Sequence, residues 1–309
     1  MQPSLPKRID YSAKNPAEIY LSGLSSSASE RTMRSCLNNA ARLFGFTHLL
    51  DVEWKALRRQ HIQYVIDQLR IKKYASSTIN LYIAALKGVA KEAWMSDLMP
   101  HGAYLKITTI KSIQFQRLPA GRSMTLRECR RLLSSCSNGS VKDVRDKAML
   151  GVMMGCGMRR AEIVNLTIDH WDNVEKAFTF IGKGNKQRLV YLPPDLNPDM
   201  NAWLKVRGDD AGPLFPRIFK CQGQEKMDLT KHMRPASIYR LVQNRSTRAG
   251  IREVTPHDFR RTFATRTLEA GIDIFVLQGA MGHASHTTTR RYDRRDAKAL
   301  AKAARALRF

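Results

Sequence analysis

Apolar residues recur at three- and four-residue steps along most of this 309-residue chain. Such spacing gathers side chains on one face of an α-helix and does not suit a strand, whose faces alternate at every residue. Two runs have strand-like sequence instead, AFTFIG at 177–182 and QRLVYLP at 187–193, and the letters KGNK separate them. Gly184 and Asn185 tolerate the positive φ of a tight hairpin turn. The sequence therefore predicts a mainly α protein with one small antiparallel sheet.

The helical pattern falls into two domains. Residues 1–28 contain prolines and a serine-rich end, which predicts a flexible N-terminal arm, and 29–105 predict a bundle of about four or five helices. The periodicity fades over 106–121, which indicates an extended basic linker. Residues 122–294 predict a second domain that is helical apart from the hairpin. An alanine-rich basic helix over 295–309 is expected to cap its own core or to dock on a neighbouring copy.

The charge of the chain restricts its function. A formal net charge of +25 and a pI near 10.3 disfavour an enzyme for small neutral metabolites and favour a polyanionic partner such as nucleic acid. A membrane surface is the rival partner, but the sequence has no apolar run of about 18 residues and no signal peptide. We therefore expect a soluble, cytoplasmic protein that is associated with the nucleoid.

The cysteine pattern argues against two common kinds of small domain. The five cysteines are an odd number and include no CxxC pair, so neither a disulfide framework nor a zinc knuckle is expected. They are predicted to be reduced and mostly buried: Cys36, Cys129, Cys136, Cys156 and Cys221.

The segment HDFR offers a pair of groups that suits an anion. Thr255 and Pro256 form a helix start, and Gly271 supplies a stop. His257 and Arg260 therefore lie three residues apart on one helix, and their side chains leave the same face within roughly 5–6 Å of each other. A hydrogen-bonding imidazole and a guanidinium can converge there on a phosphate.

Three further segments carry candidate residues, each with an ordinary alternative. In GCGMRRAEIVNL the carboxylate of Glu162 can steady the guanidinium of Arg159, although such pairs are often surface salt bridges. Lys183 lies at the hairpin tip, where a lysine is commonly just solvated, and Lys186 competes with it for any role. A short apolar helix over 274–280 should break at Gly282, after which a histidine and, in TTTRRY, a tyrosine follow. The ordinary alternative for these two residues is a core histidine and a surface phenol.

The types, order and spacings of these residues together resemble those of one family. The chain is similar to the tyrosine recombinases, also called phage-integrase or Xer-type site-specific recombinases, in GMRRAEI, IGKGNKQR, TPHDFRRTFAT and MGHASHTTTRRY. The resemblance implies a SAM-like helical core-binding domain followed by the integrase catalytic fold, with Glu162 supporting the first arginine. MGH stands where the family often has LGH. The catalytic residues that the resemblance implies are Arg159, Lys183, His257, Arg260, His283 and Tyr292.

The same resemblance implies a mechanism without metal or cofactor. Tyr292 would attack a DNA phosphate to form a 3′-phosphotyrosyl link, and because the ester conserves the bond energy, religation needs no ATP. A tyrosine ordinarily has a pKa near 10, so His257 is expected to assist as general base, with His283 hydrogen-bonding a phosphate oxygen. The two arginines would clamp the non-bridging oxygens, and Lys183 would protonate the departing 5′-oxygen.

The expected partner is double-stranded DNA with a specific recombination site, bound by a homodimer per site and a homotetramer in the synapse, with an accessory DNA-bending or regulatory protein. The reaction would serve integration or excision of a mobile element, or resolution of DNA multimers. A type IB topoisomerase-like enzyme and a non-catalytic DNA-binding regulator are the alternatives. The residues expected to contact DNA are Lys72, Lys73, Ser76, Ser77, Lys87, Lys111, Arg117, Arg122, Arg160, Lys186, Arg261 and Arg291.

Overall fold

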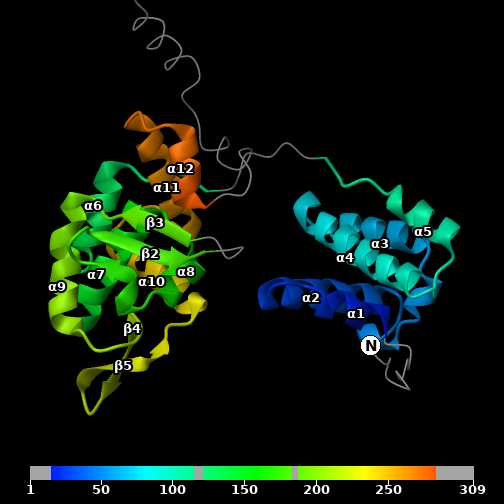
Figure 1. The fold of residues 1–309 in the computed structure, drawn as a ribbon, viewed down its shortest axis with the longest axis horizontal. Coiled ribbons are helices and arrows are strands. Elements are labelled where there is room, and N and C mark those ends of the chain that lie inside the picture. Colours follow the sequence, from blue (N-terminus) through cyan, green and yellow to red (C-terminus); the bar gives the residue numbers. More distant parts are fainter. Residues whose placement is uncertain (1–14, 115–120, 183–186, 283–309) are drawn as a thin grey trace, which may run out of the picture. The chain divides into compact units, whose positions relative to one another are not determined.

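The computed structural model describes residues 15–114, 121–182 and 187–282. The chain divides into two compact units, Met1–Arg117 and Leu118–Phe309 (Figure 1). The boundary lies inside the span that the sequence analysis assigns to the linker. None of the helices in the described ranges has the length and apolar character needed to cross a bilayer.

The first unit is a helical bundle built around its longest helix. Ile79, Ile83, Leu86 and Val89 recur at three- and four-residue steps along α4 and are buried. All four other α-helices described in this unit pack on α4. The helices are α1 (Pro16–Ser22), α2 (Ser27–Leu43), α3 (Arg59–Ile71), α4 (Ser76–Met95) and α5 (His101–Thr108), with the 3-10 turns η1 (Leu49–Asp51) and η2 (Trp54–Ala56).

The structure corrects two boundaries of this unit. Helix α1 lies inside the predicted arm, because Asn15 accepts a hydrogen bond from the amide of Ala17 at 2.9 Å, and Ala17 and Leu21, four residues apart, are both buried. A helix this short depends on that burial, which local sequence signals do not reveal. Helix α5 extends to Thr108, so the first residues of the predicted linker are helical.

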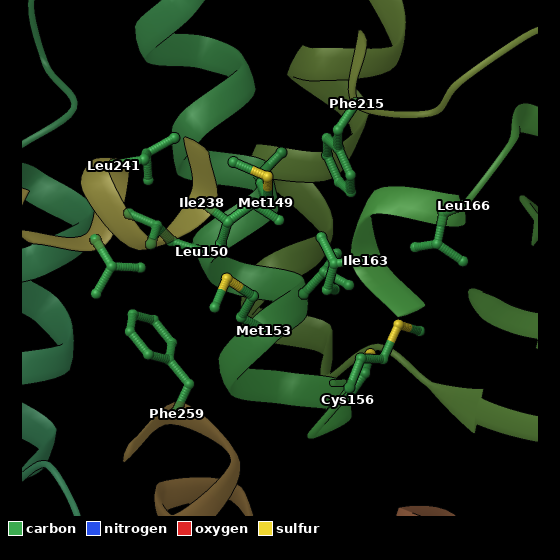
Figure 2. Packing of buried hydrophobic residues seen from close by; sticks show 14 of the residues in the cluster. Met149, Leu150, Met153, Cys156, Ile163, Leu166, Phe215, Ile238, Leu241 and Phe259 are labelled. Carbon is green, nitrogen blue, oxygen red and sulfur yellow. The ribbon is translucent and has the colours of Figure 1, made fainter. Parts of the chain in front are cut away.

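The second unit surrounds the buried helix α7. In Figure 2 Met149, Leu150 and Met153 of α7 lie among side chains from other elements, including Ile163 and Phe259. Its helices are α6 (Leu126–Ser134), α7 (Val141–Cys156), α8 (Arg160–Asn165), α9 (Asn197–Arg207), α10 (Pro235–Arg248), α11 (Pro256–Glu269) and α12 (Ile274–Met281), with 3-10 turns η3 (Ile168–His170) and η4 (Pro194–Leu196). Its strands are β1 (Trp171–Asp172), β2 (Ala177–Ile181), β3 (Gln187–Tyr191), β4 (Pro216–Cys221) and β5 (Gln224–His232).

The predicted hairpin is present. Strands β2 and β3 pair antiparallel, with Thr179 opposite Leu189, and β1 extends them to a three-stranded sheet. The expectation that the rest of the domain is helical is wrong, because β4 and β5 form a second hairpin through a turn in which Gln222 and Gly223 both have positive φ. These strands are largely exposed and rich in charged residues, so they lack the apolar alternation by which strands are recognised.

The cysteines behave as their sequence pattern predicts. All five are free, four are buried, and Cys221 is partly exposed. Burial raises the pKa of the Cys136 thiol to about 11. The four buried thiols are therefore packing groups rather than reactive ones.

Candidate active site

Arg159 is placed by a tight turn between α7 and α8. Gly157 ends α7 with φ +56, and a Cβ at this position would lie 2.2 Å from the ring of Phe263, so only glycine fits. Arg159 then becomes the N-cap residue of α8. Glu162 accepts a hydrogen bond from the Arg159 amide at 2.7 Å and pairs with its Nη1 at 2.6 Å. The expected ion pair between Arg159 and Glu162 is present.

Helix α11 carries the second candidate pair. It begins at Pro256 after the N-cap Thr255, as the sequence predicts. The Asp258 carboxylate accepts hydrogen bonds from the amide and from the hydroxyl of Thr255, both at 2.8 Å, and so closes the first turn. His257 is exposed in that turn, whereas Arg260, one turn later, is buried.

Arg159 and Arg260 meet at the end of α12. Arg159 Nη2 donates to the carbonyl oxygen of Gly282 at 2.9 Å, and Arg260 Nη2 donates to that of the preceding residue, Met281, at 2.5 Å. Arg260 Nη1 also donates to the carbonyl of Gly157, at the turn that places Arg159. The Arg159 side chain is 30% exposed. The expected convergence of the two arginines is therefore present, and one of them is open to solvent.

Arg188 is a member of this cluster that the sequence analysis missed. Its Nη1 pairs with Glu162 at 2.7 Å, its Nη2 donates to the carbonyl of Ala280, and it lies 5.0 Å from the ring centroid of Phe180. A signal for it exists in the alternation of β3, because Arg188 shares the inward face of the strand with Val190. A charged residue at an inward position is uncommon unless it is paired.

Glu162 lies between two guanidinium groups. Burial by itself would raise the pKa of Glu162, but the hydrogen bond from the Arg159 amide and the charges of Arg188 and Arg159 outweigh it and hold the pKa below the ordinary value. The carboxylate therefore stays ionised at neutral pH. Together these three groups carry one net positive charge, to which the guanidinium of Arg260 adds a second.

Some residues expected to contact DNA are already engaged within the protein. Lys87 donates to the carbonyl of Thr108, the last residue of α5, at 2.9 Å and to that of Ile110 at 2.5 Å. Arg122 pairs with Glu128 at 2.7 Å. These contacts compete with a role at DNA, so DNA binding by Lys87 and Arg122 stays a prediction that the geometry disfavours.

The remaining predicted DNA contacts differ in their exposure to solvent. Arg261 is buried, and Ser76 and Ser77 are the first residues of α4, whose N-cap is Ala75 rather than either serine. Exposed predicted contacts are Lys72, Lys73, Ser77, Lys111 and Arg160. The residues that lie outside the described ranges are Lys183, His283, Tyr292, Arg117, Lys186 and Arg291.

Known proteins resemble the chain over most of its length. The model of the phage integrase family matches residues 122–299. Tyrosine recombinase XerA of Pyrococcus furiosus is 31% identical over 269 residues, which cover 86% of this chain and 86% of the relative. Tyrosine recombinase XerC of Chromohalobacter salexigens is 28% identical over 93% of each chain.

Solved structures share the fold at lower identity. A XerH site-specific recombinase bound to a palindromic difH substrate has a TM-score of 0.63 at 20% identity, covering 94% of this chain and 95% of the other. A lambda integrase dimer bound to a COC′ core site has a TM-score of 0.67 at 12% identity, covering 91% of this chain and 94% of the other. Family model, relatives and fold agree, and this chain belongs to the phage integrase family of tyrosine recombinases and is a site-specific DNA recombinase.

Proposed function

We propose that this recombinase cleaves DNA with Tyr292 as nucleophile and Arg159 and Arg260 as the groups that bind the reacting phosphate. The observation that carries the proposal is the convergence of the two guanidinium groups on Met281 and Gly282. The chain continues from that turn toward His283 and Tyr292. Preorganised cations suit a five-coordinate phosphorus because negative charge builds on its non-bridging oxygens, and such donors contribute roughly 3–4 kcal/mol each.

DNA cleavage needs no reagent beyond the protein and the DNA. The phenol oxygen of Tyr292 forms a bond to phosphorus while the bond to the 5′-oxygen breaks, which leaves a 3′-phosphotyrosyl ester and a 5′-hydroxyl. His257, exposed in the first turn of α11, accepts the phenol proton, and Lys183 donates a proton to the leaving oxygen. His283 hydrogen-bonds a phosphate oxygen. Attack by a 5′-hydroxyl of the partner DNA then reverses the step and joins the new strands.

Strand exchange between two sites requires more than one active site. We propose a homodimer at each site and a homotetramer in the synapse, in the cytoplasm at the nucleoid, with the segment 295–309 docking on a neighbouring copy. Removal of 295–309 should abolish joining of two sites and leave binding to a single site intact. Full recombination by the truncated protein would contradict this role.

Covalent trapping tests the nucleophile. The protein is incubated with a library of nicked duplexes of random sequence, the reaction is stopped with detergent, and the linked DNA and peptide are sequenced. The expected adduct joins Tyr292 to a 3′-phosphate. Tyr292→Phe should form none, whereas the control Tyr191→Phe, which changes an exposed phenol on β3, should form it normally.

Two outcomes of that experiment would overturn the proposal. One is an adduct through another residue, and the other is an adduct with a 5′-phosphate. Products in which strands from two sites are joined distinguish recombination from topoisomerase-like relaxation, which acts on one duplex. The library also supplies the site sequence that further tests need.

A further inference from the structure

Arg188 joins three segments of the second unit. It lies in β3, a few residues after Lys183 in the sequence, and its side chain is 4% exposed. One terminal nitrogen of its guanidinium group, Nη1, pairs with Glu162 of α8, and the other, Nη2, donates to the carbonyl of Ala280 in the last turn of α12. A strand, the start of one helix and the end of another thus meet at one planar cation.

The end of α12 is shaped to receive this side chain. Gly282 has φ +58, and a Cβ there would lie 2.8 Å from Cδ and 3.0 Å from Nε of Arg188. The stem of Arg188 therefore occupies the space that a side chain at 282 would need. Within the described residues, Nε of Arg188 is buried without a hydrogen-bond partner. Burying a cation costs stability unless it is paired, so the position of Arg188 depends on its contacts with Glu162 and Ala280.

We propose that Arg188 is a positioning residue of the recombination reaction. Through Glu162 it fixes the guanidinium of Arg159, and through Ala280 it fixes the turn onto which Arg159 and Arg260 converge. The inference rests on the proposed function, since it assumes that the two arginines bind the reacting phosphate. It goes beyond that function because Arg188 acts through other groups and not on the DNA.

The variant Arg188→Lys separates the effect of side-chain geometry from that of charge. It keeps the positive charge and most of the stem, but an ammonium cannot present a planar fork to Glu162 and to Ala280 at once. Because a small displacement of catalytic groups is costly, we expect Arg188→Lys to slow cleavage about 10- to 100-fold with DNA affinity within about threefold of wild type. Arg188→Met, which leaves Glu162 without this partner, should slow cleavage further.

The assay compares two leaving groups at the DNA site that covalent trapping identifies. Single-turnover cleavage is measured on the normal duplex and on one with sulfur in place of the 5′-oxygen, since a thiolate leaves without protonation. If Arg188 acts through Arg159, its variants are slow on both duplexes. Rescue of Arg188→Lys by the sulfur duplex would overturn the proposal, because the defect would then lie in proton donation by Lys183.

A buried arginine elsewhere in the unit serves as the control. Arg207 on α9 is 3% exposed and donates to backbone carbonyls, including those of Pro213 and Gly208. Arg207→Lys should lower thermal stability but cleave at the wild-type rate when folded. If Arg207→Lys and Arg188→Lys slow cleavage equally, the role of Arg188 is only structural. Wild-type cleavage by Arg188→Lys, with the Tyr292 adduct intact, would overturn this inference and leave the proposed function standing.

A second, independent observation concerns four arginines on α6 and α10. Arg127, Arg130 and Arg131 lie on one face of α6, and with Arg248 in the last turn of α10 they line an open hollow of about 460 Å³. We call these four residues the arginine stripe. All are exposed, and no ion pair of theirs is present in the part of the chain that the structure describes. The other lining residues are Leu126, Ser134, Ser135 and Ala249.

The stripe opposes the stability of its own helix. Like charges three or four residues apart on a helix destabilise it by roughly 0.2–0.5 kcal/mol per pair, which applies to Arg127 with Arg130 and with Arg131. Arg127 also lies in the first turn of α6, where the helix dipole disfavours a cation. No carboxylate lines the hollow to offset this repulsion. An anion that is not among the described residues would offset the repulsion if it bound in the hollow.

We infer that the arginine stripe binds phosphates of a DNA segment outside the recombination site. Planar guanidinium forks suit phosphate oxygens, and the hydroxyls of Ser134 and Ser135 add donors. Helix α6 packs on α7 and α10 and lies in Figure 1 on the side of the unit away from α8, at whose start Arg159 stands. A duplex held at Arg159 therefore leaves the stripe to DNA that flanks the site or to a second duplex.

The test compares a duplex holding only the trapped site with one that has long flanks. Wild type should bind the flanked duplex more tightly and with a steeper salt dependence, by about 0.9 in log–log slope for each added phosphate contact. The triple change Arg127→Gln, Arg130→Gln and Arg131→Gln should remove that advantage and leave the short duplex unaffected. The control triple changes exposed cations of the second hairpin, Arg217→Gln, Lys220→Gln and Lys226→Gln.

Four outcomes would overturn the inference. An equal loss on both duplexes would place the stripe within the site interface, and no loss on either would show that it does not bind DNA. If the triple variant loses binding to polyglutamate but keeps its preference for flanked DNA, the stripe serves an acidic protein instead. A loss as large in the control triple would indicate a general effect of net charge.

Discussion

Arg159 and Arg260, far apart in sequence, donate to the carbonyl oxygens of adjacent residues, Gly282 and Met281. Both carbonyls lie at the C-terminal end of α12, where unpaired acceptors and the negative end of the helix dipole favour cations. The same contacts hold the two guanidinium groups close together. The end of α12 thus organises the two arginines before any DNA is present.

Replacing either arginine by lysine should slow DNA cleavage about 100- to 1,000-fold, since an ammonium cannot reproduce the paired donors. Arg260→Lys should also lower stability more than Arg159→Lys, because Arg260 is 3% exposed and spans the carbonyls of Gly157 and Met281. Single-turnover cleavage and urea unfolding measure the two effects. Arg240→Lys, which changes an exposed arginine on α10 that is not among the expected DNA contacts, is the control; wild-type rates in both test variants would refute the assignment.

Gly121→Ala should disturb the first turn of α11. Gly121 has φ +104, and a Cβ there would lie 2.3 Å from Oδ1 of Asp258, which also accepts a hydrogen bond from the Arg122 amide at 2.7 Å. We expect a loss of stability of about 1–3 kcal/mol together with slower cleavage, because His257 lies in that turn. Gly139→Ala is the matched control, with φ +72 but nothing within 4 Å of the added carbon. Equal losses in the two variants would show that backbone strain alone accounts for the effect.

Arg245→Met should be strongly destabilising. Arg245 on α10 pairs with Asp143 at 2.5 Å and with Asp146 at 2.6 Å, and all three side chains are at most 5% exposed. Removing one partner from a buried ion pair leaves charge uncompensated and costs roughly 3–5 kcal/mol. Arg34→Met, which breaks an exposed pair with Glu30 on α2, should change stability by about 1 kcal/mol or less. Urea unfolding measures both changes in stability. A small loss of stability for Arg245→Met would mean that the surrounding side chains rearrange to compensate for the missing guanidinium.

The ion pair of Glu128 with Arg122 predicts a pH dependence. Chiefly the Arg122 guanidinium lowers the pKa of Glu128 to about 2 from an ordinary 4.5. The carboxylate therefore stabilises the folded state fully above pH 4.5, and this contribution is lost as the pH falls toward 2. The difference in unfolding free energy between wild type and Glu128→Gln should be constant near neutral pH and shrink below 4.5. A difference in unfolding free energy that grows on acidification would contradict the predicted sign.

Sequence patterns predicted the elements whose causes are local. The start of α11 at Pro256, the break at Gly282 and the pairing of Arg159 with Glu162 depend on neighbours within a few residues. The hairpin of β2 and β3 was visible because its apolar residues alternate. Helix α1, by contrast, is too short to be stable alone, and the second hairpin lacks apolar alternation, so neither left a clear local signal.

By itself the sequence determined the helical character, the positive charge and the six expected catalytic residue types with their order. Only the tertiary structure decided that Arg159 and Arg260 meet at one helix end, and that Arg188 joins Glu162 to that end. The physical reason is the range of the interactions. Helix caps and turns act over a few residues, whereas a buried ion pair or a carbonyl contact forms only when packing brings distant segments together.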